Sequence, residues 1–352
     1  MDLSPSQLRA LWHALLAAPS RLSVAADTTA RPPGAPCVVR LLCPDSQQLS
    51  LTVHELDYAA GGLGFRLFPA ALWLSAWLAA LPFTLLTSLT AGGALELGAG
   101  LGLPGLTLAA RLKERGQTVT LSDFAPELLK AMAAAAAAHR LDNVAVAFCD
   151  WSCSRSTSAA FSPAANPELG RVQALAAAAA ASGELAAALA VGATFSFILA
   201  TEILYEPHAA VCVADLLAAR LARGGRFITL MAVRDAAIVA AFLQRCAAHR
   251  LRTALRPVAA LPPPPGDAAQ CAAQAEATAL RHADSPLLPM LGGGGWSEGD
   301  GASDWQPLLA KGLAACSVEV MQVADPSGAP PPSGPCCSRR ARGLACPCRR
   351  TS

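Results

Sequence analysis

Short apolar segments alternate with longer amphipathic stretches along the middle of the chain. Between residues 94 and 258 these segments have the length and the flanking residues of buried strands, and the intervals between them are long enough for helices. The predicted strands are Ala94–Leu97, Thr118–Leu121, Val144–Phe148, Phe195–Ala200 and Arg226–Met231. This alternation of strand and helix predicts a parallel sheet covered by helices.

Helices are predicted in the intervals of this pattern. They are expected at Leu106–Arg115, Pro126–His139, His208–Arg223 and Ala236–Ala248. The helix at His208–Arg223 is expected to stop at Gly224-Gly225, because glycine readily adopts the left-handed conformation that ends helices. Before this core, Val38–Leu42 and Leu49–Val53 predict a hairpin around the turn-forming Pro44-Asp45-Ser46.

A long uncharged run precedes the first predicted strand. No residue is charged between Arg66 and Glu96, which is long enough to span a bilayer. Pro69 and Pro82 interrupt the run, and its second half is polar. We interpret it as a buried helix at about Pro69–Leu81, a loop and a strand, with a membrane-spanning helix as the alternative.

Composition divides the chain into segments. Those rich in Ser, Ala, Pro or Gly have little large apolar surface to bury and are predicted to be insertions or tails. The predicted segments are an N-terminal helix and β-hairpin extension at 1–66, a core at 67–260 with a low-complexity insertion at 152–193, a Pro/Gly-rich insertion at 261–311, a returning edge strand at 312–325, and a disordered Cys/Pro/Arg tail at 326–352.

Charge and cysteine usage exclude several classes of protein. The 27 Lys and Arg residues nearly balance the 25 Asp and Glu residues, so no nucleic acid or membrane partner is expected. The cysteines are scattered singly until the tail, unlike those of a disulfide scaffold, which favours a reducing compartment and a cytoplasmic protein. We expect the protein to be a monomer. Arg9, Arg21 and Arg31 leave an organelle transit peptide as an alternative. The histidines suggest no metal site.

The most informative segment is the glycine-dense turn after the first predicted strand. Gly100-x-Gly102-x-x-Gly105 satisfies the dinucleotide-binding fingerprint, and Asp123 lies near the distance expected for a ribose-binding acid. Glu96 and Gly98 precede that fingerprint, however, and give the string Glu-x-Gly-x-Gly-x-Gly. A dinucleotide fold places its first fingerprint glycine closer to the strand, so this phasing favours a different cofactor.

This string, together with motifs before and after it in the chain, resembles a class I, seven-strand S-adenosylmethionine-dependent methyltransferase, and more narrowly the family 16 protein-lysine methyltransferases. The motifs that carry the resemblance are Phe68-Pro69-Ala70-Ala71, Glu96–Gly105, Asp123, Asp150-Trp151 and Glu202–Pro207. The resemblance covers roughly residues 49–248 without the insertion. It implies a Rossmann-like three-layer α/β sandwich, in which helices cover both faces of a seven-strand, mostly parallel sheet, and S-adenosyl-L-methionine as cofactor.

The resemblance also implies which residues hold that cofactor. The candidate cofactor-binding residues are Phe68, Glu96, Gly98, Ala99, Gly100, Gly102, Asp123, Asp150, Trp151 and Thr201. In this assignment the loop backbone holds the methionine end and Asp123 accepts hydrogen bonds from the two ribose hydroxyls. Asp150 accepts from the adenine amine, and Trp151 packs its ring against the base. Asp123 also has a second interpretation, as a cap of the helix that begins at Pro126.

The candidate catalytic residues are Glu202 and Tyr205. Methyl transfer needs an aligned nucleophile, so positioning carries much of the catalysis. Glu202 is assigned to capture and alignment of a lysine ammonium, whose pKa of about 10.4 a carboxylate neighbour would raise further. Proton loss would therefore depend on desolvation or a water path, and Tyr205 would line the acceptor channel. The implied partner is a protein substrate.

This sequence departs from the family pattern at two positions. Phe68 stands where the family usually has Trp, and Glu202 stands where it has Asp. The Thr-Glu-x-x-Tyr string at Thr201 is also similar to that of protein-histidine methyltransferases, so the acceptor can be histidine as well as lysine. A non-catalytic methyltransferase-fold binding module and an NAD-dependent oxidoreductase are the remaining alternatives.

Overall fold

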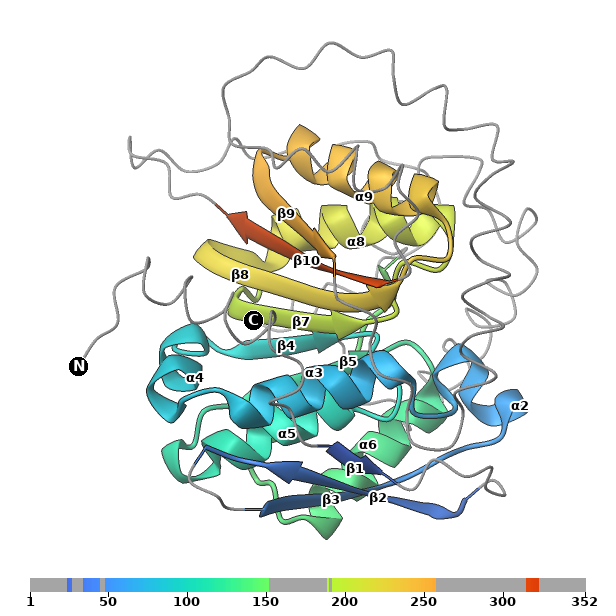
Figure 1. Ribbon diagram of the computed structural model, residues 1–352, viewed down its shortest axis with the longest axis vertical. Coiled ribbons are helices and arrows are strands. Elements are labelled where there is room, and N and C mark those ends of the chain that lie inside the picture. Colours follow the sequence, from blue (N-terminus) through green and yellow to red (C-terminus); the bar gives the residue numbers. More distant parts are fainter. Residues whose placement is uncertain are drawn as a thin grey trace, which may run out of the picture.

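A seven-stranded sheet forms the centre of the computed structural model, which describes residues 24–26, 34–44, 48–151, 189, 192–257 and 315–322 (Figure 1). Its strands are β4 (Ala94–Leu97), β5 (Val119–Asp123), β6 (Val144–Phe148), β7 (Phe195–Thr201), β8 (Leu221–Ala232), β9 (Leu251–Pro257) and β10 (Ala315–Gln322). They lie in the order β6-β5-β4-β7-β8-β10-β9, and β10 alone runs in the direction opposite to the other six strands. The predicted Rossmann-like fold with a seven-strand, mostly parallel sheet is confirmed.

Helices cover both faces of this sheet (Figure 1). They are α3 (Pro69–Ala80), α4 (Phe83–Leu89), α5 (Leu103–Leu112), α6 (Pro126–Ala138), α8 (Pro207–Arg220) and α9 (Ala236–Ala248). One core contains α3, α5 and α6, and the other contains α8 and α9. On β7, Leu199 packs in the first core and Ile198 in the second, because successive residues of a strand point to opposite faces.

A smaller antiparallel sheet packs against α3, α5 and α6 and shares their core. Its strands are β1 (Val24–Ala26), β2 (Pro36–Leu42) and β3 (Gln48–His54). The predicted hairpin is confirmed as β2 and β3, whereas β1, which pairs with β2, is not predicted by the pattern. The Thr52 N–H on β3 donates to Nε2 of His139, just after α6, over 2.8 Å. The extension is therefore fastened to the core by packing and by this hydrogen bond.

The helix stop predicted at Gly224-Gly225 is wrong. Helix α8 ends at Arg220, and Leu221 already pairs with Phe195 on β7. A register irregularity comes next, and Gly224, with a φ of 72°, lies within it. Because Leu221 is buried as the first residue of β8, the helix ends earlier than the pattern predicts. The two glycines lie in the irregular part of β8, where the pairing with β7 shifts register.

The prediction that the last strand lies at the sheet edge is also wrong. Strand β10 lies between β8 and β9, and β9, which the pattern does not predict, takes the edge. Ser317 and Glu319, polar residues of β10, are buried in this position. Glu319 forms an ion pair with Arg226 on β8. This ion pair compensates the buried charge of Glu319, so a strand with alternating polar residues can lie inside the sheet.

The uncharged run before Glu96 forms α3, α4 and β4. The predicted buried helix is confirmed as α3, while the predicted loop contains the unpredicted α4. Among the described residues no single helix is both long and apolar enough to cross a membrane. Within the same described ranges, one pair of helices, Tyr58–Gly64 and Pro69–Ala80, is together long and apolar enough to cross a membrane. The two helices are bent by 56° relative to each other.

Several predictions lie outside the described residues. They concern the N-terminal transit peptide, most of the insertion at 152–193, the insertion at 261–311 and the cysteine-rich tail at 326–352.

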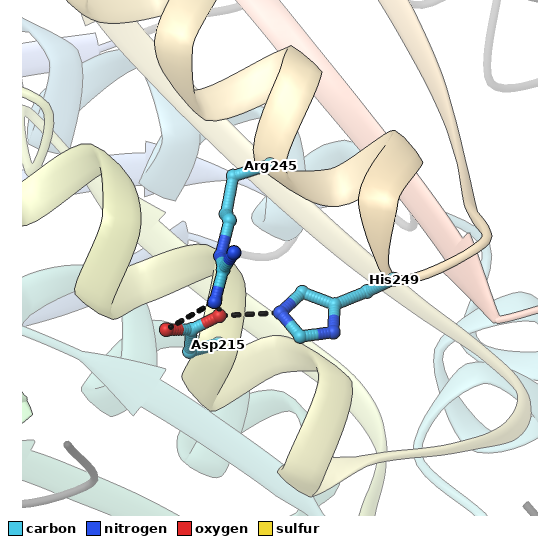
Figure 2. A network of polar contacts seen from close by, with 3 residues as sticks. All are labelled: Asp215, Arg245 and His249. Carbon is cyan, nitrogen blue, oxygen red and sulfur yellow. Dashed lines mark hydrogen bonds and ion pairs between the residues drawn. The ribbon is translucent and has the colours of Figure 1, made fainter.

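A polar network joins α8 and α9 on the second face of the sheet (Figure 2). The Asp215 carboxylate, 3% exposed, accepts hydrogen bonds from Nε and an Nη of Arg245 over 2.8 and 3.2 Å. Figure 2 shows the His249 ring, at the C-terminal end of α9, directed at the same carboxylate, and its Nε2 contacts Oδ1. Two partners thus satisfy a buried charge between two helices, which holds α9 on α8.

We expect His249→Ala to lower the free energy of unfolding by about 1 kcal/mol, the net value of one hydrogen bond. The loss is modest because Arg245 would still pair with Asp215. Urea denaturation measures it, with His54→Ala at the exposed end of β3 as the matched control. If both variants are as stable as the wild type, the His249 contact contributes nothing to the fold.

Candidate functional site

The candidate site residues gather where the parallel strands end. Glu96 lies within β4 and its glycine loop comes directly after it, Asp123 ends β5, Asp150 and Trp151 come after β6, and Thr201 ends β7. Strands β4 and β7 are neighbours in the sheet, but the chain visits β5 and β6 between them. Their carboxyl ends therefore form the topological switch point, where open α/β sheets bind ligands.

The glycine loop between β4 and α5 is held by its own backbone amides. Gly98, Gly100 and Gly102 have φ values of 58°, 56° and 76°, the last at the N-cap of α5. The Ala99 amide donates to the Ser122 carbonyl over 2.9 Å, and the Gly102 amide donates to the Ala99 carbonyl over 2.7 Å. These amides fix the shape of the loop, so they are engaged inside the protein and not directed at a ligand.

Asp123 connects this loop to β5 and to the start of α6. One carboxylate oxygen accepts from the Gly100 amide over 2.9 Å. The other accepts from the amides of Phe124 and Ala125 over 2.8 and 3.2 Å. Burial raises the pKa of the Asp123 carboxyl, and these backbone hydrogen bonds lower it in part. The N-cap residue of α6 is Ala125, which makes no side-chain capping hydrogen bond, so the capping interpretation of Asp123 is wrong and its carboxylate bonds the amides just before the helix. With three donors on about four acceptor sites, the carboxylate has about one site left for a further hydroxyl.

Glu96 is a fully buried carboxyl beneath the loop. Its Oε2 accepts from the Gly105 amide over 2.8 Å, while Oε1 has no hydrogen-bond partner within the described part of the chain. A Cβ on Gly105 would lie 2.5 Å from Glu96 Oε2 and 2.1 Å from a methyl of Leu121, so only glycine fits. Burial raises the pKa of Glu96 to about 8, with a further contribution from the charge of Asp123. Glu96 is thus a neutral acid at pH 7.

Trp151 lies against the first glycine of the loop. A Cβ on Gly98 would lie 2.7 Å from Cζ2 of the Trp151 indole and 3.1 Å from a methyl of Ile203. The indole therefore contacts the loop backbone at a position where any side chain would displace it. Asp150, beside it, is partly exposed, as is Thr201 at the end of β7.

Phe68 precedes α3 as its N-cap residue, and its ring contacts a cation. The Arg66 guanidinium lies 5.5 Å from the centroid of the Phe68 ring and 5.4 Å from that of Phe65. The residue from this region that meets the loop is Gly64, since a Cβ on Gly100 would lie 3.3 Å from the Gly64 carbonyl oxygen. Sequence reasoning missed Gly64, although the run Gly61-Gly62-Leu63-Gly64 is a visible signal of close backbone approach.

Tyr205 is a partly buried residue in the segment between β7 and α8. Burial raises the pKa of its hydroxyl, and the charges of Asp123 and Glu206 raise it further. A tyrosine in this setting remains protonated at every physiological pH, so it can donate a hydrogen bond but cannot act as a base.

Glu202 is directed toward β8. Its Oε1 accepts from the Ala232 amide over 3.1 Å, and its Oε2 forms an ion pair with Arg234 over 3.2 Å. Its φ of 54° is unusual for a residue with a side chain and costs about 1–3 kcal/mol. Burial raises the pKa of Glu202, and the Arg234 charge lowers it in part. Sequence reasoning missed Arg234, whose role follows only from the pairing of β7 with β8.

Within the described ranges, no group of three or more His, Cys, Asp or Glu side chains could hold a metal ion.

Solved structures similar to this chain share low identity with it. They include the 4+2 cyclase SpnF (13% identity, 69% of this chain and 81% of that chain, TM-score 0.38), and the Streptomyces coelicolor geranyl diphosphate C-methyltransferase in complex with S-adenosyl-L-homocysteine (12%, 65% and 71%, 0.33). The N-methyltransferase NodS from Bradyrhizobium japonicum is a third (12%, 69% and 94%, 0.33). At such TM-scores the fold assignment rests on the strand order of the sheet itself.

Sequence comparison gives a more specific result. No curated protein matches the chain. Residues 45–161, which contain the glycine loop, Glu96, Asp123 and Trp151, match a family model described as lysine methyltransferase. Residues 45–161 are therefore similar to this family, in agreement with the resemblance of the motifs in that segment, and the match does not extend to Glu202–Pro207.

Proposed function

We propose that the protein is an S-adenosyl-L-methionine-dependent methyltransferase that methylates the ε-amine of a lysine in a protein partner. The observation that carries the proposal is the glycine loop, which Asp123 and Glu96 hold at the switch point of the sheet within the segment that matches the family model. The bound cofactor supplies an activated methyl group on a positively charged sulfonium.

The described residues fit such a cofactor. Two buried carboxyls, Glu96 and Asp123, lie beneath and beside the loop, and Glu96 Oε1 has no hydrogen-bond partner among the described residues. The negative charge of the Asp123 carboxylate favours a nearby cationic group, while the neutral Glu96 offers its Oε1 as a hydrogen-bond acceptor. The Trp151 indole packs directly on Gly98, so an aromatic ring lies beside the glycine loop. These features suit a sulfonium and a flat base.

Roles in cofactor binding follow from these contacts. Asp123 orients the loop through the Gly100 amide and, with three amide donors already bound, has about one acceptor site left for a ribose hydroxyl. Trp151 offers a ring face to the adenine, and the partly exposed Asp150 can accept from its amine. The backbone of Gly64 packs closely against the loop at Gly100.

At the acceptor position, Tyr205 and Glu202 perform different tasks. Tyr205 keeps its proton, and its hydroxyl oxygen accepts a hydrogen bond from an N–H of the reacting amine, which leaves the amine lone pair directed at the methyl group. Glu202 attracts the acceptor's ammonium and lies partly buried, so part of the water around the amine would be displaced on binding. The lysine proton leaves to solvent, because neither side chain is a suitable base.

The proposal predicts binding of S-adenosylhomocysteine without comparable binding of NADH. Isothermal titration calorimetry measures both, and tight NADH binding with none of S-adenosylhomocysteine would establish an oxidoreductase instead. Incubation with lysate and methyl-labelled cofactor should then label proteins, and Asp123→Ala should lose the label. Asp142→Ala, an exposed acid after α6, is the matched control.

Mass spectrometry of the labelled proteins identifies the acceptor. Methyl-lysine is the expected product, methyl-histidine would assign the protein to the alternative acceptor, and cofactor binding without any labelling would indicate a binding module. We also propose that the protein acts as a cytoplasmic monomer, which size-exclusion chromatography and cell fractionation test.

A further inference from the structure

The Glu202 carboxylate is fixed in place by its backbone and by β8. Its own amide donates to the Leu230 carbonyl over 3.1 Å, and its Oε1 accepts from the Ala232 amide. The left-handed φ of 54° is held by these contacts on both sides. With its side chain only 12% exposed, the carboxylate needs a cation or a proton at Oε2, because a buried charge without a partner is costly.

Arg234 supplies that cation, and it is the movable member of the pair. Its side chain is 48% exposed, and a single Nη contacts Oε2 over 3.2 Å, without the two-point geometry of a strong arginine–carboxylate pair. It lies just beyond the end of β8, in the turn before α9. A half-exposed ion pair of this kind stabilises a protein by only about 0.2–1 kcal/mol.

We propose that Arg234 occupies the position of the acceptor's ammonium in the resting protein and is displaced when a lysine side chain binds. This inference rests on the proposed function and adds an internal competitor that selects for cationic acceptors. An ammonium is a compact point charge with three donors, whereas the guanidinium is a broad plane. The acceptor side chain must therefore place its own positive charge beside Glu202 Oε2, so that Arg234 can leave this oxygen and move into solvent.

Competition between Arg234 and the acceptor for Glu202 determines which acceptor side chains can bind. A neutral side chain cannot replace the guanidinium without leaving the Glu202 carboxylate unpaired, so it is rejected. A lysine ammonium exchanges one ion pair for another, at a cost equal to the weak Arg234 contact. Removing Arg234 should thus strengthen cation binding and reduce discrimination against neutral acceptors.

The test uses n-butylammonium, which has the head of a lysine side chain, titrated by calorimetry into protein saturated with S-adenosylhomocysteine. At pH 8.5 the amine is still charged, given a lysine-like pKa of about 10.4. We expect Arg234→Gln to bind n-butylammonium about two- to fivefold more tightly than the wild type. This factor corresponds to the free energy of the weak ion pair that the ligand no longer has to break. Arg252→Gln, an exposed arginine on β9, removes the same charge elsewhere and should leave the affinity unchanged.

Further variants separate the outcomes. Glu202→Gln should abolish n-butylammonium binding, and Arg234→Lys, which keeps the charge, should bind as the wild type does. Equal or weaker binding by Arg234→Gln overturns the inference about Arg234. Failure of S-adenosylhomocysteine to bind the wild type contradicts the proposed function instead, so the two failures are distinguishable.

Discussion

Replacing Asp123 by asparagine is expected to weaken S-adenosylhomocysteine binding at least tenfold and to lower the free energy of unfolding by about 2–3 kcal/mol. The carboxylate accepts from the Gly100 amide on one oxygen and from the Phe124 and Ala125 amides on the other. An asparagine has one oxygen, so its NH2 must face an N–H donor on one side. A buried donor without an acceptor costs about 1–3 kcal/mol, and every 1.4 kcal/mol of binding energy is a factor of ten.

Calorimetric titration and urea denaturation measure the two effects of Asp123→Asn. Asp142→Asn makes the same chemical change at an exposed position and should alter neither quantity. If Asp123→Asn lowers stability but keeps the wild-type affinity, the carboxylate supports the loop without contributing to cofactor binding.

Replacing Glu96 by glutamine is expected to change how stability depends on pH. The carboxyl is buried, its pKa is raised from 4.5 to about 8, and it is neutral at pH 7. Between pH 4.5 and about 8 the unfolded chain has released a proton that the folded protein retains. Stability of the wild type therefore falls as pH rises through this window. Glutamine retains an oxygen for the Gly105 amide and does not titrate, so this loss should disappear.

The stability of the wild type and Glu96→Gln should coincide near pH 4.5 and diverge by a few kcal/mol, on the order of the pKa shift converted to free energy, by pH 8.5. Urea denaturation across that range measures the divergence. Glu114→Gln, an exposed residue after α5, is the matched control and should parallel the wild type. Parallel curves for Glu96→Gln would show that the buried carboxyl is ionised in the folded protein.

Much of the core could be predicted from the sequence because both faces of the sheet are apolar. The strands at Ala94–Leu97 and Val144–Phe148 and the helix at Ala236–Ala248 have the bounds that the pattern indicates. The pattern did not predict β9, whose sequence Leu-Arg-Thr-Ala-Leu-Arg-Pro has few large apolar residues because it lies at the edge of the sheet. It placed β10 wrongly, because the burial of Glu319 depends on Arg226, a residue far away in the sequence.

The candidate site could be predicted only in part. Motifs along the chain locate Glu96, Asp123 and Trp151, which the structure places around one loop. The same motifs treat Glu202 and Tyr205 as one unit, yet the structure directs them to different neighbours. Burial and the charges of Asp123 and Glu206 raise the pKa of Tyr205, whereas Glu202 pairs with Arg234. Side-chain direction at a left-handed residue depends on tertiary contacts, which spacing along the sequence does not encode.

The place of β10 inside the sheet has a consequence for synthesis of the protein. Residues 258–314 separate it from β9, and it forms hydrogen bonds with strands on both sides. Until the ribosome has passed Gln322, β9 has no neighbour among the described strands and the outer side of β8 is an open edge. Contacts between distant segments form slowly, and open strand edges favour association with other chains. We therefore expect the nascent protein to depend on chaperones until this strand emerges.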